Sequence, residues 1–260
     1  MRQLFLLFAL ASIICTSQAA TLLNFGGSTI TNTLQNGATS AAQGQIRWGN
    51  IAYVDGQSVD LVATVVGGTY SAANLTANDT LRGGFGKINV NHSTYVEFKF
   101  SLVDSVNDTA VVASSWDFAI ADIDLNGLGN PTESVSVISG LILESYTLSS
   151  QTELSITGLY PNITATATVA GVGGDNPSDP ANLTALQEKR SILFTLSDTD
   201  SFILGLNTTS GGSGRNFLFS GEADFGDLGQ TVVSAVPEPT ALNLLAMGGI
   251  LLALRRHRTT

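Results

Sequence analysis

The chain has 260 residues, with 11 Lys or Arg against 21 Asp or Glu, so its formal net charge is -10. Four of the basic residues lie near the two ends, at positions 2, 255, 256 and 258, which leaves the central part of the chain more acidic still. Such a surface repels nucleic acid and anionic lipid and favours divalent cations, so no nucleic acid partner is expected.

A signal peptide is predicted at residues 1–19. Arg2 precedes an apolar run over residues 4–14, and small residues then lead to an expected cleavage after Ala19. A buried first helix is the alternative. The single cysteine, Cys15, lies in this segment, so the processed protein would have no disulfide, no cysteine metal site and no cysteine nucleophile.

Apolar and polar residues alternate along much of the remaining chain, which is the period of a half-buried strand. The clearest case is Val96–Leu102, VEFKFSL. Similar alternation occurs in Trp116–Ile120, Val135–Val137, Ile163–Val169 and Ile192–Leu196. Turn-forming residues separate these runs, and roughly ten or more short strands without an amphipathic helix are typical of a sandwich. The fold class predicted is all-β: a single antiparallel, jelly-roll-like β-sandwich over residues 20–229, followed by a tether at 230–235.

One irregular stretch, residues 171–189, is long for a loop inside a compact domain. Loops of this length usually have a function or are mobile. A short helical turn is expected within it, at Leu183–Gln187.

The stretch Asp122–Glu133, DIDLNGLGNPTE, matches the calcium-loop pattern D-x-[DN]-x-[DN]-G-x5-E. In that pattern alternate oxygen-bearing side chains converge on a hard cation, and the glycine permits a sharp turn. The predicted calcium ligands are the side chains of Asp122, Asp124, Asn126 and Glu133, the carbonyl of Leu128, and Asn130 directly or through water. Such loops normally lie between helices, whereas strand-like segments flank this one, so an acidic turn without metal is the alternative.

Asp122 and Asp124 also form a carboxylate pair on one face of a strand, as glycoside hydrolysis requires. The stretch resembles the Glu-x-Asp-x-x-Glu strand of jelly-roll glycosidases similar to laminarinases, but here the first acid is Asp and the third is missing. A secreted jelly-roll glycoside hydrolase acting on matrix polysaccharide is therefore the alternative function. The two histidines, His92 and His257, lie in a turn and in the tail, so no pair exists for a triad or a zinc site. The protein is predicted not to be an enzyme.

Two further sets of residues bear on surface recognition. Aromatic rings stack on sugars or fill a core, and the candidates are Trp48, Tyr53, Tyr70, Tyr95 and Tyr160. Asn-x-Ser/Thr triplets suggest a glycosylated surface or reflect a turn-rich composition, and they begin at Asn74, Asn78, Asn91, Asn107, Asn162, Asn182 and Asn207.

Residues 236–260 read VPEPTALNLLAMGGILLALRRHRTT. A Pro-Glu-Pro triplet, an apolar run and terminal arginines occur there in order, at Pro237, Glu238, Pro239, residues 241–254, Arg255, Arg256 and Arg258. This arrangement resembles the PEP-CTERM sorting signal of Gram-negative bacteria. The resemblance covers only the tail. It implies transient anchoring in the inner membrane by a short transmembrane helix, processing by an exosortase, which is a membrane-embedded cysteine protease, and delivery to the cell surface or extracellular matrix.

The length of the apolar run bears on how long that anchor lasts. A helix over residues 241–254 would span about 21 Å, less than the hydrocarbon core of about 30 Å. This favours a temporary hold over the alternative, a permanent single-pass anchor.

A second resemblance covers about Gly44 to Glu222. The stretches that carry it are the Asp122–Glu133 motif, DNPSDP at Asp175–Pro180 and GGSGRNFLF at Gly211–Phe219, and they are similar to an uncharacterised extracellular β module of aquatic bacteria and algae. It implies one domain and brings no activity. The expected function is that of an exported surface or matrix protein, structural or adhesive, with calcium as the candidate cofactor and extracellular polysaccharide as the candidate partner.

Overall fold

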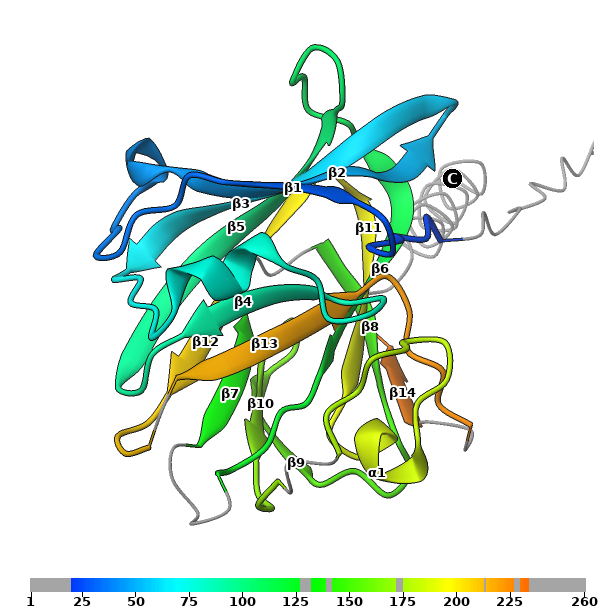
Figure 1. The fold of residues 1–260 in the computed structure, drawn as a ribbon. Helices are drawn as coiled ribbons and strands as arrows, with labels where there is room; N and C mark the ends of the chain where they lie inside the picture. The colour runs from blue at the N-terminus through cyan, green and yellow to red at the C-terminus, as the bar shows by residue number, and fades with distance from the viewer. Residues whose placement is uncertain are drawn as a thin grey trace, which may run out of the picture.

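The computed structural model describes residues 20–126, 132–138, 142–171, 175–212, 214–226 and 230–233. Nearly all of its regular structure is β-strand, in two antiparallel sheets that pack face to face (Figure 1). The all-β antiparallel sandwich predicted from the alternation of side chains is therefore confirmed.

The larger sheet has eight strands in the order β1-β2-β3-β5-β12-β7-β10-β9. Their bounds, in chain order, are β1 Thr29–Asn32, β2 Gln45–Val54, β3 Gln57–Gly68, β5 Thr94–Asp104, β7 Glu133–Val137, β9 Leu154–Leu159, β10 Asn162–Ala167 and β12 Ser201–Thr208.

The smaller sheet has six strands in the order β14-β8-β11-β6-β13-β4. Their bounds are β4 Gly86–Val90, β6 Ala113–Ala121, β8 Leu143–Leu148, β11 Ile192–Thr199, β13 Arg215–Ser220 and β14 Gln230–Val233. Short helices lie in the connections: the 3-10 helices η1 Ala41–Gln43 and η2 Leu75–Asp79, and the α-helix α1 Ala185–Glu188.

The strands form where alternation is strict, because a strand points successive side chains to opposite faces of its sheet. In β5 the apolar positions Phe98 and Phe100 are buried, whereas Lys99 between them is exposed. The β2–β3 hairpin closes through Asp55-Gly56, and both residues have positive φ, 50° and 80°. Asp-Gly is the pair that a two-residue hairpin turn with φ > 0 favours.

Aromatic side chains fill the space between the two sheets. Phe118 of β6 lies 5.0 Å from Phe100 of β5 and 4.9 Å from Phe202 of β12, measured between ring centroids. Further along the interface Trp48 of β2 meets Phe219 of β13 at 5.1 Å. Each of these pairs joins one sheet to the other, so the core lies between the sheets and both are held by the same cluster.

The helical turn expected in the loop over residues 171–189 is present as α1. Thr184 caps it, because its hydroxyl accepts from the backbone N–H of Gln187 while the Gln187 side chain accepts from the backbone N–H of Thr184. This reciprocal capping box stabilises a helix start even in a very short helix.

Residues 230–233, expected to belong to a tether, form β14, which pairs with β8. The rest of the predicted tether, the signal peptide at 1–19 and the sorting signal at 236–260 lie outside the described residues. Within the described part of the chain no helix has the length and apolar character to cross a membrane.

Candidate metal centre

Asp122 and Asp124 directly follow β6 and point to the same side of the chain. Asp122 has a left-handed backbone, with φ 67°, which ends the strand. Ile123 between them is buried in the core, and its N–H donates to the carbonyl of Arg190 at 3.0 Å. Because the apolar side chain faces inward, its two acidic neighbours lie together on the other side, and both are buried.

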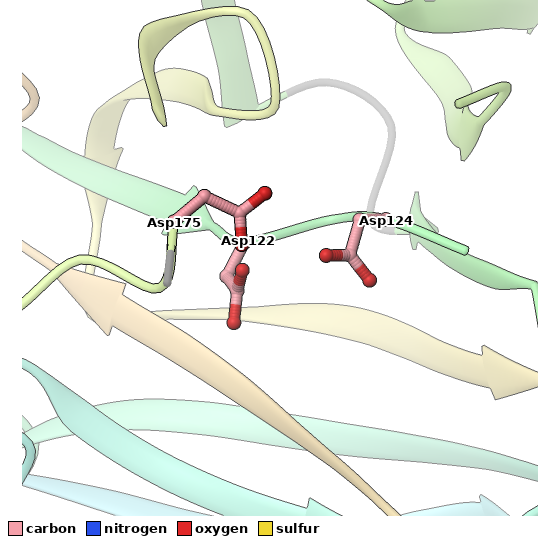
Figure 2. Close-up of side chains that lie close together, drawn as sticks. All are labelled: Asp122, Asp124 and Asp175. Atoms are coloured by element: carbon pink, nitrogen blue, oxygen red, sulfur yellow. The ribbon is translucent and has the colours of Figure 1, made fainter. Parts of the chain in front are cut away.

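A third buried aspartate, Asp175, joins this pair from the loop that precedes α1. One carboxylate oxygen from each of Asp122, Asp124 and Asp175 lies within 4.8 Å of the others. Figure 2 shows the Asp122 and Asp175 side chains next to each other and the Asp124 carboxylate turned toward them. Oxygens bound to one calcium at about 2.3–2.6 Å can be at most roughly 5 Å apart, so the spacing fits one calcium ion.

Two arginines border the three aspartates on either side. Arg190 forms ion pairs with Asp175 and, through Nε at 2.9 Å, with Glu153, and its Nη1 lies 3.9 Å from Asp124 Oδ2. Arg215 of β13 bridges Asp124 through Nη2 and Glu133 through Nε. Both guanidinium groups therefore hold carboxylates in fixed positions.

Glu133, the last ligand of the predicted calcium loop, is completely buried at the start of β7. Its Oε1 accepts from Arg215, and its Oε2 accepts from the backbone N–H of Asp124 at 3.2 Å. Glu133 thus orients Arg215 and Asp124, and it is not one of the three residues whose oxygens converge.

Asp122 and Asp124 line a cavity of about 270 Å³, and Asp175 is not among its lining residues. Its walls are formed by Asp122, Asp124, Leu125, Asn126, Glu133, Gly171, Asn176, Gly214, Arg215 and Asn216. Asn126, a predicted ligand, is among them, whereas the predicted ligands Leu128 and Asn130 lie outside the described residues. The asparagines add carboxamide groups, whose oxygens also bind calcium.

Asp122 differs from the other acids of the cluster. Only 7% of its surface is exposed, it lines the cavity, and it makes no hydrogen bond or ion pair to any described residue. A buried charge without a partner is costly. The side chain is therefore placed for a partner that would enter the cavity.

Gly171 lets Asp124 reach its position. A Cβ at residue 171 would lie 1.7 Å from Asp124 Oδ2, which no side chain allows. The Gly171 N–H donates to the carbonyl of Leu125 at 2.7 Å, so the two segments are also joined by backbone. Only glycine permits this close approach.

The electrostatics of the cluster follow from its burial. The pKa of Asp122 is raised to about 7, first by burial and next by the charge of Asp124, against the opposing charge of Arg215. Burial also raises the pKa of Glu133, again against Arg215. Both raised pKa values have the same cause: the acidic groups are buried, and the nearby positive charge is too small to keep them ionised at their ordinary pKa.

The buried carboxyl groups of the cluster outnumber the guanidinium groups around them. The four buried carboxyl groups are those of Asp122, Asp124, Glu133 and Asp175. Two guanidinium groups form ion pairs with them, one of these guanidinium groups is shared with Glu153, and the charge of Arg82 acts on Asp122 without an ion pair. Buried charges require partners, either by protonation or by a cation. A divalent cation with oxygen ligands would supply the missing charge, so the residues present fit calcium.

The sequence motif pointed to Asp122 and Asp124 and missed Asp175, which lies 51 positions after Asp124. Asp175 stood out only through its place in the long irregular stretch over residues 171–189 and in the DNPSDP motif, and neither indicates a metal ligand. Local spacing in the sequence cannot predict which acidic residue of a loop will contact another loop, because that contact depends on the tertiary structure.

No family model and no curated protein sequence matches the chain. Two solved structures are similar at a distance. The N-terminal domain of the Streptococcus gordonii adhesin Sgo0707 aligns with a TM-score of 0.47 and 9% identity over 73% of this chain and 47% of that one. The adhesin domain of PrgB from Enterococcus faecalis, solved bound to DNA, aligns with a TM-score of 0.40 and 15% identity over 68% of this chain and 66% of that one. The chain thus spans about half the length of the first, and likenesses this distant carry no function across.

Proposed function

We propose that this protein is a calcium-binding module of the cell surface or extracellular matrix, with a structural or adhesive role. The observation that carries the calcium assignment is the group of Asp122, Asp124 and Asp175, whose oxygens lie within 4.8 Å of one another beside a cavity. The predicted signal peptide and sorting tail support export, transient anchoring in the inner membrane, and processing by an exosortase-type protease.

Calcium would connect parts of the fold that are distant in sequence. Asp122 and Asp124 follow β6, and Asp175 belongs to the loop leading to α1 and β11. An ion bound by all three would fix both connections at one end of the smaller sheet. An exported domain without a disulfide would gain stability in this way, since a ligand that binds only the native state stabilises it.

Thermal unfolding of the full-length chain in detergent, with calcium and with chelator, tests the proposal. At a calcium concentration about a hundredfold above Kd, the free energy of unfolding rises by about 2.7 kcal/mol. For a domain of this size each kcal/mol corresponds to about 2–4 °C in Tm. Asp122→Asn should remove the rise. Without calcium the variant should be at least as stable as the wild type near neutral pH, because the substitution breaks no hydrogen bond and removes a buried charge.

Asp117→Asn is the matched control, since Asp117 is another acid of β6, bound to Thr195 at 2.8 Å and away from the cluster. This variant should keep the calcium-dependent rise. A wild-type Tm that is the same in calcium and in chelator would contradict the calcium site. An undiminished calcium-dependent rise in the Tm of Asp122→Asn would contradict it as well.

The hydrolase alternative rests on the same pair, because Asp122 and Asp124 do lie together and the pKa of Asp122 is raised to about 7. A general acid with such a pKa is what glycosidases use. This alternative predicts release of sugars from a matrix polysaccharide by the wild type and none by Asp122→Asn. Absence of release by the wild type across a broad substrate panel would dispose of it.

A further inference from the structure

A second cavity, of about 410 Å³, lies at the opposite end of β6 from the metal centre. Its walls are formed by Ala20, Thr21, Tyr53, Val54, Asp55, Val112, Ser114 and Asp198. Tyr53 and Asp55 come from the β2–β3 hairpin of the larger sheet, whereas Ser114 and Asp198 come from β6 and β11 of the smaller one. The cavity therefore opens where the ends of the two sheets meet.

The Tyr53 ring is the most prominent feature of this cavity. Its exposed fraction is 73%, the highest of any described aromatic residue, and its hydroxyl makes no hydrogen bond to a described residue. Val112, which is also largely exposed, adds a second apolar surface. Because these two side chains stay exposed to water, they contribute little hydrophobic free energy to folding. A ligand that covers them would gain free energy by burying their apolar area.

Polar groups of the same cavity are uncommitted as well. Asp55, Ser114 and Asp198 make no hydrogen bond or ion pair within the described part of the chain. Asp55 in the β2–β3 turn and Asp198 near the end of β11 both have left-handed backbones, with φ 50° and 47°. The cavity thus offers carboxylate acceptors beside an aromatic ring.

This combination defines the chemistry of the ligand. A sugar ring has apolar C–H faces that pack on an aromatic ring and peripheral hydroxyls that donate to carboxylates, which are strong acceptors. No Lys, Arg or His is among the residues that line the cavity, so an acidic sugar would meet two carboxylates without a compensating charge. We propose that the Tyr53 cavity binds neutral saccharide units of an extracellular polysaccharide.

This assignment rests on the proposed adhesive role, for which it names the ligand class and the site, but it does not depend on the metal centre. Ser114 lies near the start of β6 and Asp122 directly follows its end, so they are eight residues apart, or about 26 Å at roughly 3.3 Å per residue. At that distance a substitution in the Tyr53 cavity leaves the ligands of the proposed calcium ion in place. The two sites can therefore be tested separately in one protein.

Binding is measured by calorimetry on the full-length chain in detergent, with neutral β-glucan, mannan and galactan oligosaccharides and with alginate oligosaccharides as acidic comparison. The wild type should bind at least one neutral oligosaccharide and prefer it to alginate. Tyr53→Ala should weaken that binding roughly tenfold or more, because the stacking surface is removed. Asp198→Asn should weaken it as well, through loss of a charged acceptor.

Tyr95→Ala is the matched control. Tyr95 is also on the surface, with 45% exposed, but its hydroxyl donates to Glu97 at 2.7 Å and it lies outside the cavity. Its removal should leave saccharide binding unchanged. The Tm is recorded for every variant with calcium and with chelator, and a Tm in chelator close to that of the wild type shows that the fold is intact.

Three results would overturn the assignment: no neutral oligosaccharide binds the wild type, alginate is preferred, or Tyr53→Ala weakens binding no more than Tyr95→Ala does. Saccharide binding that is lost in Asp122→Asn but kept in Tyr53→Ala would move the ligand to the metal centre. A calcium-insensitive Tm with saccharide binding that depends on Tyr53 would instead reject the calcium site alone.

Discussion

At the scale of single residues, the most informative side chain is Asp122. Three of its acidic neighbours form ion pairs with arginines, whereas Asp122 lines the cavity and forms no ion pair with a described residue. A buried carboxylate in that position stays charged only if a cation approaches, and otherwise it takes up a proton. If the proposed calcium ion binds here, it competes with a proton for this carboxylate.

The pH dependence of stability follows from that competition. Burial raises the pKa of Asp122 from its ordinary value of 3.8 to about 7 in the folded protein, so between these pH values the folded state binds the extra proton. In chelator, Asp122 should therefore lower the free energy of unfolding by at most about 4 kcal/mol as pH rises from about 4 to about 7. Glu133, whose pKa is raised to about 8, should add to the fall. Urea unfolding across this range measures the fall.

Two comparisons accompany the pH series. Asp122→Asn should make the fall smaller, since the amide does not titrate, and the raised pKa of Glu133 accounts for part of what is left. Calcium should also make the fall smaller by stabilising the charged form near neutral pH. A chelated wild type whose stability rises between pH 4 and pH 7 would contradict the assignment of a raised pKa.

At the scale of elements, β14 shows how a short strand differs from a tether. Its partner is β8, with Val232 opposite Tyr146 and Val233 opposite Ser145, and the hydroxyls of Thr147 and Thr231 lie 3.0 Å apart. Four residues contain too little alternation to predict a strand. They form one because the backbone groups at the edge of β8 are available for pairing. The folded domain therefore continues to residue 233.

Hydrogen exchange tests this pairing. Because alternate amides of an edge strand point to its partner, either Thr231→Pro or Val232→Pro must remove an N–H that faces β8. We expect slow exchange over residues 230–233 in the wild type and its loss in one of the two proline variants. Thr231→Val serves as control, since it keeps the backbone N–H. Fast exchange of the whole segment in the wild type would show that β14 is not formed in solution.

At the scale of the whole molecule, stability depends on the aromatic cluster that both sheets share. The Phe118 ring contacts four other aromatic rings. Trp116 belongs to the same strand, β6, and the other three are Phe100 of β5, Phe202 of β12 and Phe219 of β13. Removing its ring opens a cavity at the centre of the interface, where neither sheet can move without losing other contacts. The cost should therefore be large.

Phe118→Ala is expected to lower the free energy of unfolding by about 3–5 kcal/mol. Leu159→Ala is the matched control, because 87% of Leu159 is exposed at the edge strand β9, and its loss should change stability by less than about 0.5 kcal/mol. Chemical denaturation of both variants measures the difference. Equal effects would mean that the packing between the sheets is not what holds them together.

Much of this protein can be predicted from its sequence because the relevant signals are local. Strict alternation, as in Val96–Leu102, determines a strand and its buried face without reference to other segments, and Thr184 with Gln187 determines a helix start. The proximity of Asp122 and Asp124 is equally local, since they are two positions apart on one strand end.

What only the tertiary structure decided concerns residues that meet across the fold or differ only in exposure. Asp175 joins the metal centre, and Glu133 binds Arg215, because loops from separate strands end at the same place. Among the seven Asn-x-Ser/Thr triplets, Asn78 is buried and hydrogen-bonded to Tyr70, so the folded chain offers no glycosylation site there. Trp48 and Tyr53 look alike as candidate sugar platforms, yet one is core and the other surface. Sequence determines which faces are apolar, whereas long-range packing determines which groups those faces bring together.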